Sequence, residues 1–164
     1  MADAEPIKAI VTPVRLEYDF TAGKAATLFL RGLARKKIIG ARSGPGQPVL
    51  VPPRGADPRT SELAAEAVEV KDTGTVVTYS IIRVPSENIK FELPYACVNV
   101  LLDGAAIGFF HVLQNCPLED VRIGMRVRAK WVADDKLTTS VSSIEYFEPT
   151  GEPDVPYEKL RENT

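Results

Sequence analysis

Alternating apolar and polar positions run through the second half of the chain, and they predict a series of β-strands. Short runs rich in β-branched and aromatic residues recur there, at 68–82, 93–102, 105–113, 124–132 and 137–147. Asp103-Gly104 separates the second run from the third and predicts a hairpin, because glycine accepts a positive φ without steric cost. About five strands in so short a stretch favour a small closed barrel, and we expect a five-stranded OB-type barrel in a mainly β protein.

Nearer the N-terminus the apolar spacing changes to a helical period. The positions that share one stripe are Ala25, Leu28, Phe29 and Leu33. They predict a helix over 22–36, with Thr21 as the cap of its first turn. The basic run 35–37 suits the negative end of the helix dipole.

Between the helix and the barrel, residues 40–60 are rich in proline and glycine around Val49-Leu50-Val51. Turn residues on both sides of a short apolar triplet predict a compact knuckle. A disordered linker is the alternative, in which these apolar residues would be poorly placed.

The two ends of the chain are expected to be extended. Residues 1–10 read as a mobile acidic tail, and residues 11–20, with Pro13 inside, as an extended or edge segment. The expected division is an N-terminal tail and helix (1–37), the knuckle (38–64), the barrel (65–149) and a C-terminal tail (150–164).

Composition fits a globular protein with a core of its own. Of the 164 residues, 45% are hydrophobic and 26% charged, and thirteen prolines with eleven glycines favour short strands over a helical bundle. Cys97 and Cys116 lie in or beside apolar strand-like sequence, where a free thiol serves as a small core residue. No signal peptide or membrane-length apolar run is visible, so we expect a soluble protein of the cytoplasm.

Charge is distributed unevenly along the chain. Residues 21–60 hold eight basic residues and one acidic residue, a net charge of +7 in a protein whose total is −2. A basic block on an acidic protein suggests an anionic ligand or partner surface. The alternative is a solvated helix and loop that happen to be basic.

No catalytic constellation emerges from the residue types. The single histidine, His111, lies in an apolar strand-like run and reads as structural. Cys97 could approach it across the hairpin, but the two side chains need not face the same side of the sheet. No glycine-rich phosphate loop is present. We therefore expect no catalytic residue and no enzyme activity in this chain.

Nucleic-acid binding, which OB barrels often perform, is disfavoured. Such sites combine a basic groove with exposed aromatic residues. Here the barrel is acidic and the sequence pI is about 5.5. Only the row Arg126, Arg128 and Lys130 argues for it.

From residue 20 to residue 147 the chain resembles the zinc-ribbon/OB-fold family of proteins that accompany thiolases. The landmarks are FLRGL at 29–33, IGAR at 39–42, VPPR at 51–54, TGTVVTYS at 73–80, PYACV at 94–98, LDG at 102–104 and IGMRV at 123–127. Each is weak alone, but their order and spacing are fairly specific.

The resemblance places Ser43, Gly46, Asp57 and Thr60 at the positions of the family's four zinc-ligand cysteines. Structural zinc needs a nearly complete set of thiolate or imidazole ligands. We therefore expect no metal and no other cofactor, and a knuckle held by prolines, by packing of Val49 and Val51, or by a partner.

The resemblance also implies a partner function. Family members bind thiolase-like enzymes, including lipid-transfer-type thiolases and aldolases of steroid side-chain degradation, and can help to form the acyl-CoA channel. The residues expected to contact CoA phosphates or another anion are Arg31, Arg35, Lys36, Lys37, Arg42 and Arg54. The residues expected to form an apolar partner interface are Leu28, Phe29, Leu33, Val49 and Val51. The alternative is a stand-alone module that binds acyl-CoA or another anionic ligand.

Overall fold

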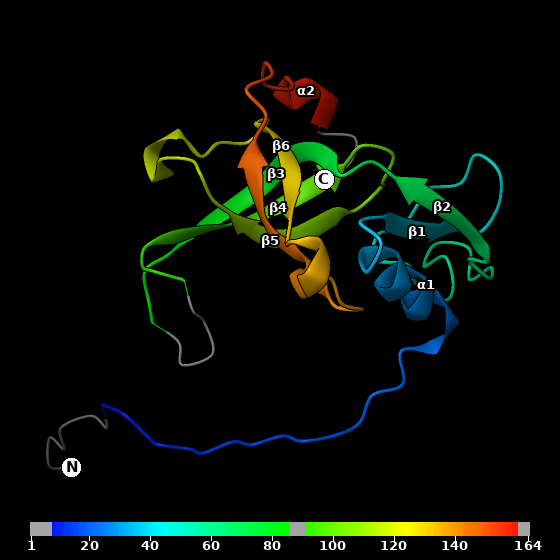
Figure 1. Ribbon diagram of the computed structural model, residues 1–164, viewed down its shortest axis with the longest axis horizontal. Coiled ribbons are helices and arrows are strands. Elements are labelled where there is room, and N and C mark those ends of the chain that lie inside the picture. Colours follow the sequence, from blue (N-terminus) through cyan, green and yellow to red (C-terminus); the bar gives the residue numbers. More distant parts are fainter. Residues whose placement is uncertain (1–7, 86–90, 161–164) are drawn as a thin grey trace, which may run out of the picture.

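The protein is a small β-barrel with a helix and a two-stranded sheet packed beside it (Figure 1). The computed structural model describes residues 8–85 and 91–160. None of the helices in these two ranges is long and apolar enough to cross a lipid bilayer.

The barrel contains five strands. They are β3 (Thr73–Ile82), β4 (Tyr95–Leu102), β5 (Gly108–Leu113), β6 (Arg126–Trp131) and β7 (Ile144–Pro149). Their order around the closed barrel is β3-β4-β5-β7-β6, with β5 and β7 parallel and the other pairs antiparallel. This is the five-stranded Greek-key barrel that the alternating pattern predicts, so the expected OB-type fold is confirmed.

The two-stranded sheet consists of β1 (Ile38–Arg42) and β2 (Glu66–Val70). The sequence pattern joins residues 68–82 into one strand, but the structure divides them. Residues up to Val70 pair with β1, and the chain enters the barrel only at Thr73. Alternation alone does not reveal such a change of sheet, because both segments have the same period of two.

Residues 40–60 are ordered, and the linker alternative is wrong. Leu50 exchanges backbone hydrogen bonds with Ala41, at 3.1 and 2.9 Å. Val49 and Val51 are buried. The knuckle is therefore held by its own packing and backbone pairing.

Helix α1 (Gly23–Leu33) is shorter than the predicted 22–36. Lys36 has a φ of 56°, in the left-handed region, and Lys37 N donates to Gly32 O at 3.0 Å, which closes the helix end. The N-cap position is Ala22, without a side-chain cap, so the assignment of Thr21 as the cap is wrong by one residue.

One continuous core links the helix, the two-stranded sheet and the barrel. Phe29 of α1 packs edge-on against Phe109 of β5 with ring centroids 6.1 Å apart, and Phe109 in turn packs against Phe147 of β7 at 6.2 Å. The helix and knuckle thus share buried surface with the barrel.

The C-terminal segment is not wholly an extended tail, which corrects the expectation for 150–164. The short 3₁₀ helices η1 (Leu118–Asp120), η2 (Asp134–Lys136) and η3 (Val141–Ser143) lie in the barrel loops, and α2 (Tyr157–Leu160) follows β7. Val155 N donates to Gly124 O at 2.9 Å, and Leu160 is buried. Residues 1–7 and 161–164 lie outside the described ranges, and with them most of the expected acidic tail.

Candidate functional site

The knuckle brings Ser43 and Asp57 together, two of the four residues expected at zinc-ligand positions. Asp57 is only 2% exposed, and its Oδ1 accepts a hydrogen bond from the backbone N–H of Arg59 at 2.9 Å. Ser43 Oγ lies 3.4 Å from Asp57 Oδ2. Thr60 Oγ1 instead contacts Glu62 Oε2, at 3.3 Å. One carboxylate and one hydroxyl do not fit zinc, which favours thiolate and imidazole donors.

Within residues 8–85 and 91–160, no three His, Cys, Asp or Glu side chains are grouped in a way that could hold a metal ion. The knuckle is instead joined by hydrogen bonds to the Asp57 carboxylate and backbone.

Three of the six residues expected to contact an anion are already paired within the chain. Lys37 Nζ lies 2.8 Å from Glu69 Oε2, and Arg42 Nη2 lies 2.5 Å from Glu66 Oε1. The hydrogen bond from Arg42 lowers the pKa of Glu66 below its usual value. Lys36 pairs with Asp134. Their charges are thus partly neutralised.

The remaining three residues, Arg31, Arg35 and Arg54, are exposed. In the part of the chain that the structure describes, none of them has a carboxylate partner. These three retain the positive charge that an anionic ligand or an acidic surface would need.

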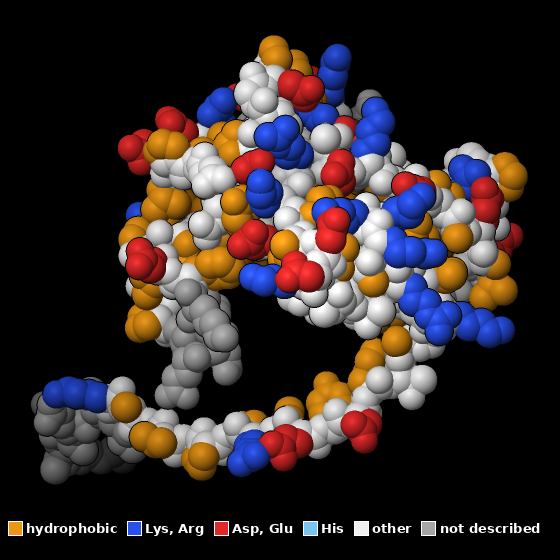
Figure 2. Space-filling model, viewed as in Figure 1, with side chains coloured by type: hydrophobic (Ala, Val, Ile, Leu, Met, Phe, Trp, Pro, Cys, Tyr) orange, Lys and Arg blue, Asp and Glu red, His pale blue; other side chains and the backbone are white. Residues whose placement is uncertain are grey.

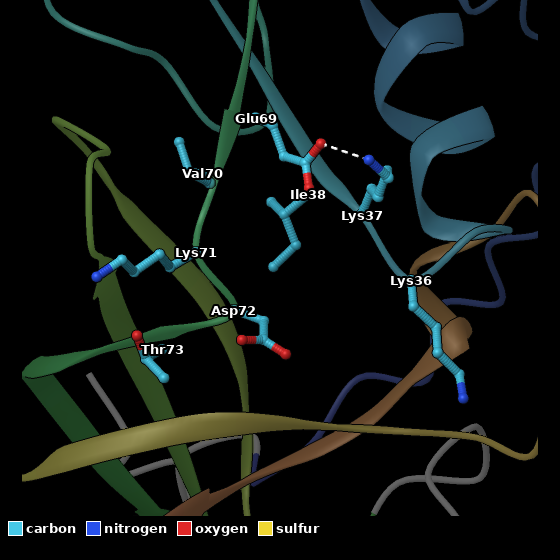
Figure 3. Close-up of a pocket in the computed structure, with 8 residues that line it drawn as sticks. All are labelled: Lys36, Lys37, Ile38, Glu69, Val70, Lys71, Asp72 and Thr73. Atoms are coloured by element: carbon cyan, nitrogen blue, oxygen red, sulfur yellow. Dashed lines mark hydrogen bonds and ion pairs between the residues drawn. The ribbon is translucent and has the colours of Figure 1, made fainter.

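A pocket of ≈ 510 Å³ lies between the end of α1 and the start of the barrel (Figure 3). Lys36, Lys37 and Lys71 line it, but Figure 3 shows their ammonium groups pointing in different directions, with Lys37 turned to Glu69. Asp72 projects between them, and its Oδ2 accepts a hydrogen bond from Trp131 Nε1 at 3.1 Å. The lysines do not converge, so this pocket is poorly suited to a phosphate group.

The expected apolar partner interface is largely wrong. Phe29, Leu33, Val49 and Val51 are all buried in the chain's own core. Only Leu28, at 45% exposure, faces outward. The helix stripe is covered by the barrel and the knuckle, and four of these five residues therefore cannot form a docking surface.

The outer side of α1 forms a different surface, which we call the helix groove. It is an open hollow lined by Thr21, Ala22, Gly23, Lys24, Thr27, Leu28 and Arg31. Lys24, Leu28 and Arg31 are spaced at i, i+4 and i+7, so they lie one above another on the same side of the helix. The groove therefore combines one exposed leucine with two cations (Figure 2 shows Lys and Arg side chains over this side of the body).

His111 and Cys97 do not form a nucleophile–base pair. Cys97 lies opposite Val112 in the β4–β5 register, and His111 lies opposite Val98, so the two side chains project to opposite faces. Burial between Phe109 and Phe147 lowers the pKa of His111, and burial raises the pKa of the Cys97 thiol. Neither group is prepared for nucleophilic chemistry.

One candidate feature escaped the reading of the sequence. Residues 14–20 alternate strictly between apolar and charged side chains, and the structure leaves this segment extended and exposed. The alternation of residues 14–20 is a signal in the sequence, but Pro13 favoured the interpretation of 11–20 as an extended or edge segment.

The fold and surface together define an OB-fold protein with an additional two-stranded sheet. A family model described as the C-terminal OB-fold domain of ChsH2 matches residues 67–132. That range includes nearly all of β2 and the barrel strands β3 to β6.

Two solved structures are similar over more of the chain. One is described as an Ltp2-ChsH2(DUF35) aldolase; it is 21% identical, with a TM-score of 0.59 over 77% of this chain and 95% of that one. The other is a protein of unknown function from the DUF35 family of Sulfolobus solfataricus; it is 21% identical, with a TM-score of 0.57 over 77% of this chain and 84% of that one. No curated protein matches. At this level of identity, the two structures establish the fold that the chain shares with them.

Proposed function

We propose that this protein is a non-catalytic accessory subunit of a thiolase-like acyl-CoA enzyme, either a lipid-transfer-type thiolase or a side-chain-cleaving aldolase. The observation that carries the proposal is the likeness to a chain of the Ltp2-ChsH2(DUF35) aldolase, which is matched over 95% of its length. The likeness extends well beyond the 67–132 segment matched by the OB-fold family model.

The chemistry of the chain supports a supporting role. Its one histidine and its buried cysteine face opposite sides of the sheet, and Lys24 and Arg31 line an open groove on the surface of α1. The partner would supply the catalytic groups. We place the complex in the cytoplasm because Cys97 and Cys116 are free thiols, as is usual in a reducing compartment.

We further propose that the knuckle is a zinc ribbon that has lost its metal. Ser43, Gly46, Asp57 and Thr60 would stand in for the four ligands, with hydrogen bonding to Asp57 in place of coordination. Such a ribbon keeps its shape without thiolates because β1, β2 and the barrel share one core.

For contact with CoA phosphates we favour Arg31, Arg35 and Arg54, because Lys36, Lys37 and Arg42 are engaged with carboxylates. A guanidinium can hold a phosphate through two parallel N–H donors. These three residues would border the acyl-CoA channel at the interface with the enzyme.

The test is affinity capture of the full tagged chain from its native host, with the bound proteins identified by mass spectrometry. We expect a thiolase-like enzyme in stoichiometric amount, absent from a capture with the tag alone. Recovery of the chain by itself under mild conditions would contradict the accessory role.

The second candidate is a stand-alone acyl-CoA binding module, and the helix groove with Lys24 and Arg31 is the observation that favours it. It predicts that the isolated chain binds CoA with measurable heat in calorimetry and that Arg31→Ala weakens the binding. An accessory subunit would show this affinity only in complex with its enzyme.

A further inference from the structure

The N-terminal segment Val14–Phe20, which we call the arm, has the pattern of a half-buried β-strand. Val14, Leu16, Tyr18 and Phe20 alternate with Arg15, Glu17 and Asp19. Side chains two residues apart project from the same face of an extended chain, so the arm has one apolar face and one charged face.

Both the apolar face and the backbone of the arm lack a partner. Its four apolar side chains are between 77% and 80% exposed. Among the described residues, no backbone hydrogen bond involves residues 14–20, and Arg15 forms an ion pair with Glu17 on the charged face of the arm. In Figure 1 this segment runs away from α1 as an isolated extended trace, and in Figure 2 hydrophobic side chains follow one another along it.

The arm leads directly into the helix groove. Phe20 is followed by Thr21, Ala22 and Gly23, which line that groove together with Lys24, Leu28 and Arg31. The apolar face of the arm and the cationic helix groove are thus continuous along the chain. A partner that contacts both needs an apolar groove beside an acidic surface.

A second copy of this chain is the alternative occupant, because two barrel strands are only partly paired. β3 pairs with β6 over Thr73–Thr75 alone, and β5 pairs with β7 at Leu113 alone. In the two-stranded sheet, β1 is bounded on one side by β2 and bridged on the other by Leu50, and the edge of β2 has five residues against the seven of the arm. The enzyme subunit is preferred here because the arm continues into the cations of the helix groove and an accessory subunit needs a contact with its enzyme.

We propose that the arm adds as a β-strand to a sheet edge of the thiolase-like enzyme subunit, with its apolar face in a groove there and the helix groove on an adjoining acidic surface. Strand addition would pair the backbone groups of the arm and bury its apolar face in one step. The inference rests on the proposed function, and it assigns the contact with the enzyme to a segment outside the OB barrel.

The test uses the full-length chain with Leu16→Asp and Tyr18→Asp, which place two charges on the apolar face. The matched control is Glu17→Lys with Asp19→Lys, which changes two charged residues on the opposite face. Each protein is used for capture from the native host, and its affinity for the recovered enzyme subunit is then measured. We expect the apolar-face variant to bind at least about 100-fold more weakly. The control should stay within about tenfold of the wild type, as rim charges usually do.

Hydrogen exchange gives a second readout that does not depend on the substitutions. Amides of residues 14–20 in the wild-type chain should exchange at once when it is free and become protected in the complex, because strand pairing sequesters them. Protection that appears in the free chain at high concentration, together with a doubled mass, would assign the arm to a second copy and overturn the proposal.

The outcomes separate the two proposals. If the wild type captures the enzyme and the apolar-face variant captures it equally well, the role of the arm is wrong and the accessory function stands. If the wild type captures no thiolase-like enzyme, the proposed function fails and the inference fails with it.

Discussion

Asp103, in the hairpin turn between β4 and β5, anchors the best-connected polar cluster on the barrel. Arg126 binds its carboxylate through two nitrogens, at 2.8 and 2.7 Å, and Thr73 donates to it at 2.6 Å. Arg126 also donates to Thr75 at 3.0 Å. The cluster joins the β4–β5 turn to the starts of β3 and β6, so it fixes the barrel at the end where β2 enters.

Asp103→Asn should lower the free energy of unfolding by about 2 kcal/mol at pH 7, because the charge-assisted pair with Arg126 is lost. The hydrogen bonds from Arg126 hold the pKa of Asp103 below its usual value. A lowered folded-state pKa gives stability that is complete above the unfolded value of about 3.9 and is lost as the pH falls through the folded value. The difference in free energy of unfolding between the wild type and Asp103→Asn should therefore become smaller as the pH falls below about 4.

Urea unfolding of both proteins at pH 7 and at successively lower pH measures this effect. Glu69→Gln is the control, because its ion pair with Lys37 is half exposed and should be worth less than about 1 kcal/mol. If the difference in free energy of unfolding did not depend on pH, packing and not the carboxylate charge would stabilise the β4–β5 turn.

At the level of single residues, the sequence predicted which side chains are buried. It did not predict which surface buries them. The sequence correctly predicted that four apolar side chains are shielded from solvent, namely Phe29, Leu33, Val49 and Val51. Their assignment to a partner was wrong because hydrophobicity does not distinguish the chain's own core from another protein's surface. The contact of Phe29 with Phe109, eighty positions later in the chain, shows that the helix packs on the chain's own barrel.

Among the elements, the knuckle is organised by hydrogen bonds around the buried residue Asp57. Asp57 N donates to Glu62 O at 2.9 Å, and Ser61 N donates to Asp57 O at 2.8 Å. Together with the carboxylate contacts to Arg59 N and Ser43, these hydrogen bonds make Asp57 the centre of its turn.

If hydrogen bonding has replaced metal, a chelator should leave the midpoint of thermal unfolding unchanged, and elemental analysis should find no stoichiometric zinc. Asp57→Ala should lower the free energy of unfolding by about 1–3 kcal/mol, because it leaves the backbone N–H of Arg59 and the hydroxyl of Ser43 without their acceptor. Asp57→Asn is the control, since its amide oxygen can still accept from Arg59 N. A chelator-sensitive midpoint would contradict the metal-free knuckle.

The elements with a clear period were predictable, and those set by distant contacts were not. The barrel strands and α1 follow from apolar spacing, and most of their ends lie within three residues of the prediction. The exceptions are β3, which begins five residues later than the predicted 68, and β7, which begins at Ile144 and not at the predicted 137. The order of residues 150–160 could not be read locally, because a segment rich in proline and charge is typical of a solvated tail. It is held by Arg122, whose Nε lies 2.5 Å from Asp154 Oδ2, and by Gly124, both some thirty residues earlier.

For the whole molecule, the two outer segments that the structure describes, 14–20 and 150–160, differ in their packing. The C-terminal segment turns back onto the barrel and buries Leu160, whereas the arm at the other end leaves its apolar face exposed. The C-terminal segment is thus packed on the barrel, whereas the arm is not packed on the rest of the chain. The proposed enzyme contact lies at the arm.

The fastening of the C-terminal segment can be tested at Gly124, where φ is +93° and an added Cβ would lie 2.6 Å from Val155 O. Gly124→Ala should therefore combine backbone strain with a clash against the segment itself. Gly151→Ala is the matched control, because φ there is +80° and nothing lies within 4 Å of the added Cβ. Strain alone should cost each variant about 1 kcal/mol, and Gly124→Ala should lose a further 1–2 kcal/mol, roughly, as residues 152–160 detach.

Urea unfolding gives the two energies, and hydrogen exchange of residues 152–160 shows whether the segment has detached. We expect faster exchange there in Gly124→Ala only, with the barrel strands β3 to β6 still protected. Equal losses in the two variants would mean that the segment lies on the barrel without stabilising it. In that case both outer segments would be available to a partner, and the difference in packing that points to the arm would lose its physical basis.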